Sequence, residues 1–325
     1  MTVDTDILSR LRKGRVLFDG GLGTMLIAKG LQPGMPPEEW NRTRPSLVRE
    51  IHSAYLDAGA DVIETNTFGG TPFRLTSYGV GDMIGEINTT GVRLAKEAVE
   101  EFSRGHNRST TGSSDPAPTA KNPKRYVALS LGPTGMMMQP LGNFTENEIK
   151  TEFVKTMKST IGTIDLILIE TIYDLREGLL ALEAVKSVSE TPVAVSLTFN
   201  KNPRGYFTVM GDEAGESIKK LTGAGADVVG ANCTITSTEM TELAVRLREN
   251  TDLPILCQPN AGQPTIRDGA HVYEQRAEEF AQHMIDLYDV GINAAGGCCG
   301  TTPDFIREVS IRLQNYKSSD AASAS

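Results

Sequence analysis

The sequence is poor in the residue types that define several large classes of protein. It contains four cysteines, one tryptophan and four histidines in 325 residues, and no window of about 18 residues is continuously apolar. We therefore expect neither a secreted domain stapled by disulfides nor a membrane-spanning helix. The opening segment MTVDTDILSRLRKGR alternates charged and apolar side chains and has no signal-peptide core. A cytoplasmic protein that does not bind membranes is expected.

Basic residues are also in the minority. The 32 lysines and arginines face 41 aspartates and glutamates, which gives a formal net charge of -9, and the basic residues form no cluster along the sequence. Because this balance repels a phosphate backbone, we expect no nucleic acid as a partner. The hydrophobic share of 39% and the charged share of 22% are ordinary for a globular protein and exclude collagen, coiled-coil and disordered classes.

A recurring pattern predicts that helices and strands alternate. In AYLDAGADVIETNTF (54–68) and KKLTGAGADVVGANCT (219–234), an amphipathic helix leads into a short apolar run rich in β-branched residues. Looser copies occupy 160–171 and 287–299, and further apolar runs occupy 16–18, 126–131, 193–197 and 254–257. Eight runs without polar alternation indicate parallel strands covered on both faces. We predict an α/β protein with a single (β/α)8 TIM barrel, and a doubly wound open sheet is the alternative.

Helical patterns lie between these runs, for example at 45–58 and 273–288. Residues 104–124, RGHNRSTTGSSDPAPTAKNPK, almost lack large apolar side chains, so we predict a flexible insertion before the third strand. The barrel domain is expected to span 1–316, with 317–325 as a disordered tail. The insertion interrupts the alternation without ending it, so a single domain is predicted.

Three of the four cysteines fall where a barrel would carry its chemistry, at the C-terminal ends of strands. Cys233 follows the sixth strand, Cys298 and Cys299 follow the eighth, and Cys257 lies within the seventh. Because the sixth and eighth strands flank the seventh, the three thiols can meet across the barrel mouth. Three thiolates with an open fourth position suit zinc. One alternative is that the cysteines pack in the core, which the flanking glycines disfavour. The other is a redox pair, which is disfavoured because adjacent cysteines form a strained disulfide.

Two carboxylates occupy equivalent positions. Asp19 follows the first strand and Glu170 ends the fourth, so together they could bind the ammonium group of an amino-acid substrate. The alternative is an ion pair with a lysine or arginine at the mouth. Gly20, Gly21 and Gly23 leave backbone N–H groups for a carboxylate.

A zinc ion at this place predicts thiol chemistry. A metal-bound thiol loses its proton and can attack an activated methyl group to give a thioether. A zinc hydrolase is disfavoured because such sites prefer histidine and carboxylate ligands, and the four histidines lie away from the predicted strand ends. A phosphate-binding barrel enzyme with packed cysteines is a more distant alternative.

The strand ends also carry a family resemblance. The segments are DGGLGT (19–24), TNTFGG (65–70), LGPTG (131–135), ET (170–171), GANC (230–233), PNAG (259–262) and GGCCGTTP (296–303). From about residue 10 to about residue 315 the chain resembles the homocysteine S-methyltransferase family. Within it, the chain resembles the homocysteine-binding module of cobalamin-dependent methionine synthase, and betaine–homocysteine methyltransferases are related.

The resemblance implies a (β/α)8 barrel in which Cys233, Cys298 and Cys299 hold zinc and the sulfur of homocysteine completes the tetrahedron. It also implies substrate contacts at five strand-end residues: Asp19 and Glu170 at the ammonium group, Gly20 and Thr67 near the carboxylate, and Asn232 in support of the first thiol. The implied reaction is zinc-dependent methyl transfer to homocysteine in methionine biosynthesis.

The methyl donor is less constrained. Betaine-using animal members carry a tyrosine where this chain has Thr171, which disfavours their scheme, yet Trp40 lies about where such relatives have an aromatic residue facing the onium group. Ordinary packing of Trp40 is the alternative. S-methylmethionine and S-adenosylmethionine are further family donors.

A corrinoid methyl donor would require a carrier protein. These 325 residues provide no folate or cobalamin domain, so methylcobalamin would have to arrive on a separate protein. The alternatives to a self-sufficient enzyme are therefore a module that works only with a corrinoid carrier, or a member specific for betaine or another onium compound.

Overall fold

The computed structural model describes residues 6–109, 124–160, 162–267 and 270–316. Its central sheet has eight parallel strands in the order β1-β12-β9-β8-β5-β4-β3-β2. A parallel bridge between Phe18 and Val62 joins the two edges. This closure confirms the predicted barrel, and the open-sheet alternative is wrong. The strands are β1 (Val16–Leu17), β2 (Val62–Glu64), β3 (Tyr126–Leu131), β4 (Leu166–Ile172), β5 (Val193–Leu197), β8 (Val228–Thr236), β9 (Ile255–Asn260) and β12 (Ala294–Ala295).

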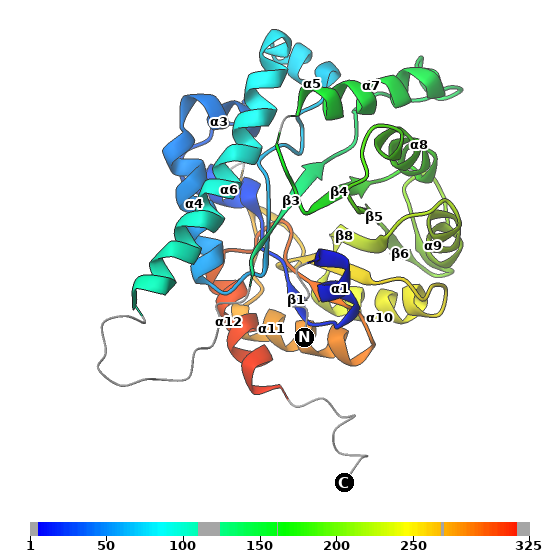
Figure 1. Ribbon diagram of the computed structural model, residues 1–325. Helices are drawn as coiled ribbons and strands as arrows, with labels where there is room; N and C mark the ends of the chain where they lie inside the picture. The colour runs from blue at the N-terminus through cyan, green and yellow to red at the C-terminus, as the bar shows by residue number, and fades with distance from the viewer. Residues whose placement is uncertain (1–5, 110–123, 161, 268–269, 317–325) are drawn as a thin grey trace.

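Helices surround this barrel (Figure 1). They are α2 (Leu22–Ala28), α3 (Trp40–Thr43), α4 (Pro45–Asp57), α5 (Pro72–Ser77), α6 (Ile84–Ser109), α7 (Glu146–Ser159), α8 (Leu175–Lys186), α9 (Ala214–Gly223), α10 (Ser237–Arg248), α11 (Ala277–Asp289) and α12 (Pro303–Asn315), with 3-10 turns at Pro37–Glu39 and Gly81–Met83. None of the described helices is long and apolar enough to cross a membrane.

Two sequence predictions shift at their boundaries. The helix expected from residue 273 begins only at Ala277; before it, the Gln275 N–H donates to the Ala261 carbonyl of another loop at 3.3 Å. Residues 104–109 of the flexible insertion expected at 104–124 are instead helical, because α6 continues through Ser109. Residues 110–123 and the tail at 317–325 lie outside the described residues.

The core has two layers, and successive residues of each strand alternate between them. In β4, Leu166 and Leu168 face the barrel interior, whereas Ile167 and Ile169 face the helices. The interior also receives Ile7 and Leu11 from α1 (Ile7–Arg12), which lies across the N-terminal opening (Figure 1). Apolar side chains thus close the bottom of the barrel and leave the opposite end for polar chemistry.

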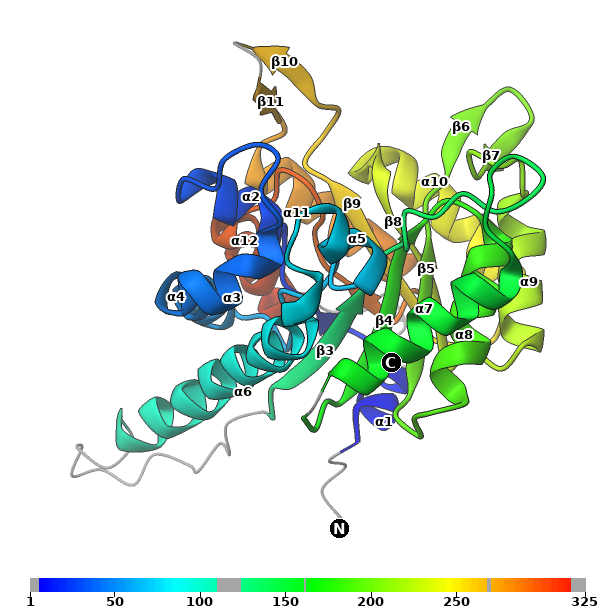
Figure 2. The ribbon, with the colours of Figure 1, turned by 90° about the horizontal axis from the view of Figure 1, so that it is seen from above.

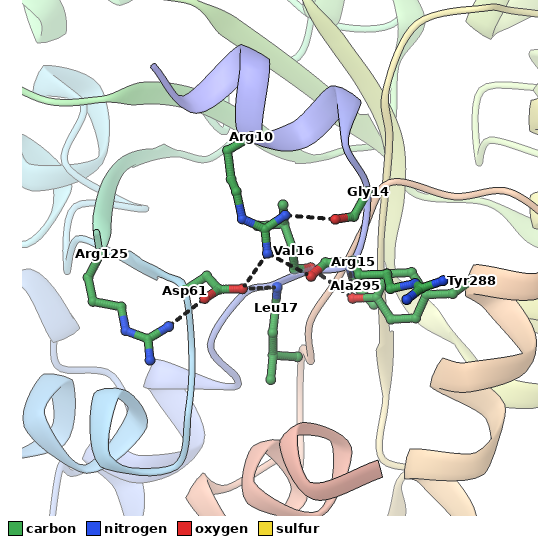
Figure 3. Close-up of polar contacts among 9 residues, drawn as sticks. All are labelled: Arg10, Gly14, Arg15, Val16, Leu17, Asp61, Arg125, Tyr288 and Ala295. Carbon is green, nitrogen blue, oxygen red and sulfur yellow. Dashed lines mark hydrogen bonds and ion pairs between the residues drawn. The ribbon is translucent and has the colours of Figure 1, made fainter. Parts of the chain in front are cut away.

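A charged network fastens the same N-terminal end (Figure 3). Asp61, just before β2, pairs through Oδ2 with Arg10 of α1 at 3.3 Å and accepts a hydrogen bond from the Leu17 N–H at 3.1 Å. Its other oxygen, Oδ1, binds Arg125 at the start of β3. The network therefore ties the first helix to three neighbouring strands.

Two antiparallel hairpins project at the opposite end, beyond the C-terminal ends of the strands (Figure 2). One consists of β6 (Asn200–Asn202) and β7 (Gly205–Phe207) and follows β5. The other consists of β10 (Thr265–Arg267) and β11 (Ala270–Val272) and follows β9. They flank the barrel mouth, where the predicted site residues lie.

Candidate functional site

The structure brings the three predicted thiols together. Cys233 lies near the end of β8, where the register with β9 shifts and the backbone turns into the left-handed region, with a φ of 60° at Cys233. Cys298 and Cys299 follow β12. The three sulfur atoms lie within 4.8 Å of one another, and Cys233 Sγ is 3.9 Å from Cys299 Sγ. Cys257 stands apart, buried in β9, and burial raises the pKa of its thiol to about 12.

Backbone hydrogen bonds fix the loop that carries the adjacent pair. The N–H of Cys298 donates to the Pro259 carbonyl at 2.9 Å, and the N–H of Cys299 donates to Asn260 Oδ1 at 3.2 Å. A Cβ atom at Gly297 would lie 2.3 Å from Thr301 Oγ1, so the close approach of these loops requires a glycine there. The end of β9 therefore positions the thiols that follow β12.

The three thiols change one another's pKa values. Hydrogen bonds from Cys233 and Cys298 lower the pKa of Cys299 to about 3. The pKa of Cys298 is raised well above its ordinary value by its hydrogen bonds to Cys233 and Cys299 and by burial. Three clustered, half-buried sulfur atoms are a donor set that fits Zn²⁺.

Three carboxylates, not two, lie at the C-terminal ends of strands β1, β2 and β4. Asp19 is fully buried; its Oδ2 accepts a hydrogen bond from the Glu64 N–H at 3.0 Å, and its Oδ1 has no partner. Glu64 accepts a hydrogen bond from Gln258 Nε2 at 2.7 Å, and Glu170 accepts one from the Ser130 hydroxyl. A buried carboxylate oxygen without a partner indicates a place for a hydrogen-bond donor from a ligand.

Burial raises the pKa of all three carboxyl groups, that of Glu170 to about 7. The proximity of the acids adds to the effect, since Glu170 raises the pKa of both Asp19 and Glu64. Across the described ranges, no lysine or arginine forms an ion pair with any of the three. The structure therefore does not contain the alternative predicted for Asp19 and Glu170, an ion pair at the mouth.

Asn232 connects the carboxylates with the thiols. Its Oδ1 accepts hydrogen bonds from the Thr171 N–H at 2.9 Å and the Ser196 hydroxyl at 2.8 Å. Its Nδ2 donates to Thr171 Oγ1 at 2.7 Å and approaches Glu170 Oε2 at 3.4 Å. Because Asn232 directly precedes Cys233, these bonds hold the acidic and sulfur-bearing parts of the mouth in one arrangement.

The groups that were predicted to bind the substrate carboxylate already have partners within the protein. The Gly21 N–H donates to Thr301 Oγ1 at 2.9 Å. Contrary to the prediction, it is therefore not free to bind a substrate carboxylate. The Thr67 hydroxyl donates to the Ser130 carbonyl at 2.8 Å, and its N–H donates to Thr65. A Cβ atom at Gly20 would lie 2.7 Å from Thr301 Oγ1, so a glycine is needed for this packing. Roles for Gly20 and Thr67 in substrate binding stay predictions.

Trp40 lies in the hydrophobic core around α3 and α4. Its side chain is only 6% exposed, and the Arg44 guanidinium lies 5.0 Å from the ring centroid. The ring is thus packed and one face already meets a cation. Contact of Trp40 with an onium donor stays a prediction.

Sequence reasoning missed two residues at this site. Glu64 ends β2 just as Glu170 lies near the end of β4, so the same rule of strand ends could have assigned it a role. Tyr273 lies between β11 and α11, and its ring packs against Gly300, the residue after Cys299. No sequence signal marked Tyr273, since it falls in a stretch with helical periodicity.

The fold and the site together define the class of protein: a TIM barrel whose mouth carries three thiols that could hold a metal ion. The chain matches the model of the homocysteine S-methyltransferase family over residues 16–313 and belongs to that family.

Relatives extend this assignment. The chain is 30% identical over 325 residues to the methionine synthase of Mycobacterium leprae (strain TN), covering 95% of this chain and 25% of that protein. It is 31% identical over 327 residues to the methionine synthase of Mycobacterium tuberculosis (strain ATCC 25618 / H37Rv), covering 97% and 26%. The chain therefore spans about a quarter of the length of these relatives.

A solved structure shares the fold. The homocysteine methyltransferase MmuM from Escherichia coli, in its metallated form, superposes with a TM-score of 0.73 at 21% identity, covering 91% of this chain and 96% of that one. This similarity supports the barrel architecture.

Proposed function

We propose that this chain transfers a methyl group to the thiol of homocysteine and forms methionine, with zinc held by Cys233, Cys298 and Cys299. The observation that carries the proposal is the juxtaposition of two sites of different chemistry. Three thiols suited to a soft metal lie at the same mouth as two buried carboxylates, Asp19 and Glu170, and the half-buried Glu64, none of which pairs with a cation among the described residues. Homocysteine carries a thiol and an ammonium group on one short chain, so it can meet both sites at once.

The carboxylates would bind the ammonium group. The unpartnered Oδ1 of Asp19 is the natural acceptor for one of its N–H groups, and Glu170 supplies a second negative charge. Asn232, which approaches Glu170 Oε2 at 3.4 Å, keeps Glu170 and the Cys233 backbone in place. A bound ammonium would offset the burial that raises the carboxyl pKa values, so these acids would ionise as the substrate enters.

Zinc bound by the three cysteines would supply a fourth position at which a substrate thiol loses its proton. The substrate sulfur would then form a bond with the methyl carbon, while the bond between that carbon and its leaving group breaks and leaves its electron pair on the leaving group. No general acid or base is needed in this step. The chain contributes by orienting the substrate at both ends and by excluding water from the mouth.

The test is methionine formation by zinc-loaded protein with homocysteine and, in separate reactions, betaine, S-methylmethionine, S-adenosylmethionine or free methylcobalamin. Turnover with one donor, together with one zinc per chain, would support a self-sufficient enzyme. Protein that binds neither zinc nor homocysteine would contradict the proposal.

A second candidate is a module that methylates homocysteine only with a corrinoid carrier protein. A rim of exposed apolar side chains favours it: Ile27, Leu141, Val209 and Ile266 are between 66% and 74% exposed, the highest values for large apolar residues among those described. They lie in the segments that follow β1, β3, β5 and β9, so they encircle the mouth. Exposed apolar side chains at this end of the barrel suit contact with another protein better than contact with a small charged donor.

These candidates differ in what restores turnover. The second predicts homocysteine binding without turnover on any small donor, and turnover once a methylated corrinoid protein is added. Replacing Leu141 and Ile266 by serine should lower that partner-dependent rate and leave zinc content and homocysteine affinity unchanged. Equal rates for the variant and the original protein would contradict docking on this rim.

A further inference from the structure

Gln258 lies inside the mouth of the barrel, and the proposed reaction does not use it. It belongs to β9, in which Leu256 contributes to the interior layer of the core and Cys257 to the layer that faces the helices. Because successive side chains of a strand alternate between its two faces, Gln258 points into the barrel. The residue is only 2% exposed. A buried amide group therefore lies at the same end of the barrel as the three carboxylates.

Only one side of this amide group has a partner. Its Nε2 donates a hydrogen bond to Glu64 Oε1 at 2.7 Å. The oxygen at the other side of the amide, Oε1, is buried and has no hydrogen-bond partner in the described part of the chain. A buried acceptor in this state costs free energy, so it indicates a hydrogen-bond donor that these residues do not supply.

A glycine brings Gln258 next to Asp19. Gly296 directly follows β12, the strand that separates β9 from β1 in the sheet. A Cβ atom at Gly296 would lie 3.3 Å from Gln258 Nε2 and 2.9 Å from the Asp19 carbonyl oxygen, so both residues border the same point. The absence of a side chain there lets Gln258 reach past β12 to Glu64. Since the Glu64 N–H donates to Asp19 Oδ2 at 3.0 Å, the three side chains form one connected group.

This group contains two of the buried side-chain oxygens that lack a hydrogen-bond partner. Across the described ranges these oxygens are Asp19 Oδ1, Asn88 Oδ1 and Gln258 Oε1. Asn88 belongs to α6, a helix outside the sheet, whereas the other two lie together at the mouth. Buried acceptors are nearly always satisfied in folded proteins, so two at one place indicate a ligand with more than one N–H donor. The ammonium group of the proposed substrate has three.

We propose that Gln258 is a specificity-determining residue whose Oε1 accepts one N–H of the substrate ammonium group, beside Asp19 and Glu170, so that the site selects an unsubstituted ammonium. This inference rests on the proposed function, because it takes homocysteine as the ligand. Three acceptors then match the three N–H donors of a primary ammonium group. A methyl group on the nitrogen would remove one donor and leave one buried oxygen unpaired, which a site built for hydrogen bonding rejects.

The test is calorimetric titration of the zinc-loaded protein with homocysteine and with N-methylhomocysteine, which has the same thiol and carboxylate. The original protein should bind homocysteine about 10- to 100-fold more tightly, the value of one hydrogen bond to a charged group. Gln258→Met conserves the volume without the amide. It should weaken homocysteine binding by about the same factor and reduce the preference to less than about threefold, because the N-methyl group can then lie against the methionine side chain.

Two further variants accompany this comparison. Gln258→Asn keeps an amide group but withdraws it by one methylene, so it should lose the preference as Gln258→Met does. The matched control is Gln282→Met on α11, an exposed glutamine whose Nε2 donates to Asp286 Oδ1 at 2.9 Å. It should bind both ligands with the affinities of the original protein.

The outcomes separate this inference from the proposed function. Equal affinities of the original protein for the two ligands would overturn the inference alone, whether or not the variants fold. Equal losses of both ligands in Gln258→Met would also overturn it, since Gln258 would then act only by holding Glu64 in place. Original protein that binds neither zinc nor homocysteine would overturn the proposed function and this inference together.

Discussion

The short strand β2 has an acidic residue at each end, and the two acids have opposite surroundings. Asp61, before the strand, is neutralised by Arg10 and Arg125 and also accepts a backbone N–H at the bottom of the barrel (Figure 3). Glu64, the last residue, is half-buried at the mouth near Asp19 and Glu170, with no cation paired to it in the described part of the chain.

The difference separates a structural end of the barrel from a binding end. Paired charges close the N-terminal end and stabilise the fold. Buried carboxylates without a counter-ion cost free energy in the empty protein, so their presence indicates a ligand that supplies the charge. This division agrees with the general rule that barrel function resides at the C-terminal ends of the strands.

The largest expected effect at the binding end comes from Cys298→Ala. Loss of one of three sulfur ligands should abolish stoichiometric zinc binding and lower methyl transfer at least about 1000-fold. The matched control is Cys257→Ala, which removes a buried thiol outside the cluster and should retain zinc at a stability cost of about 1 kcal/mol. Metal analysis and turnover measure both. A full zinc complement in Cys298→Ala would rule out the proposed ligand set.

At the structural end, Asp61→Asn should lower the free energy of unfolding by about 2–4 kcal/mol, because two arginines lose their partner. Homocysteine affinity should not change. The control is Asp304→Asn, which breaks an ion pair with Arg307 whose Asp304 side chain is 83% exposed and should cost less than about 0.5 kcal/mol. Denaturant unfolding measures the difference. Equal effects of the two variants would remove the distinction between the two ends.

A smaller effect is expected from Asp19→Asn, which removes the charge proposed to face the substrate ammonium. Homocysteine affinity should fall about 10- to 100-fold, since a charge-assisted bond becomes a neutral one. Binding of 4-sulfanylbutanoate, which lacks the amino group, should hardly change, and zinc content should stay at one per chain. Calorimetric titration with both ligands tests this. Equal losses for both ligands would show that Asp19 does not recognise the ammonium group.

The smallest effect concerns pH. The pKa of Glu170 is raised from its ordinary value of 4.5 to about 7 in the folded protein. Its contribution to the free energy of unfolding is therefore fully present below the pKa of the unfolded chain and is lost as pH rises through about 7. Without metal and substrate, Glu170→Gln should therefore gain stability relative to the original protein between about pH 5 and pH 8, by about 1–2 kcal/mol. Unfolding at both pH values gives the difference. A constant difference would show that burial does not shift this group.

The sequence predicted the barrel because its strands are buried on both faces and so appear as apolar runs without alternation. It predicted the helix at 45–58 equally well, since α4 spans Pro45–Asp57. It failed at residues 273–276, where helical periodicity continues but the Gln275 N–H bonds to the Ala261 carbonyl and α11 begins only at Ala277. It also could not place Trp40, whose burial depends on the helices packed around it.

The sequence by itself determined which residues reach the barrel mouth, because the end of a strand is a local property of the chain. Cys233, Cys298 and Cys299 could be expected to meet on that basis. Only the tertiary structure decided which acids are neutralised. The arginines that pair with Asp61 lie 51 and 64 residues away in the chain, and no cation reaches Glu64 at the other end of the same strand in the described residues. Charge pairing over such separations exists only once the barrel has closed.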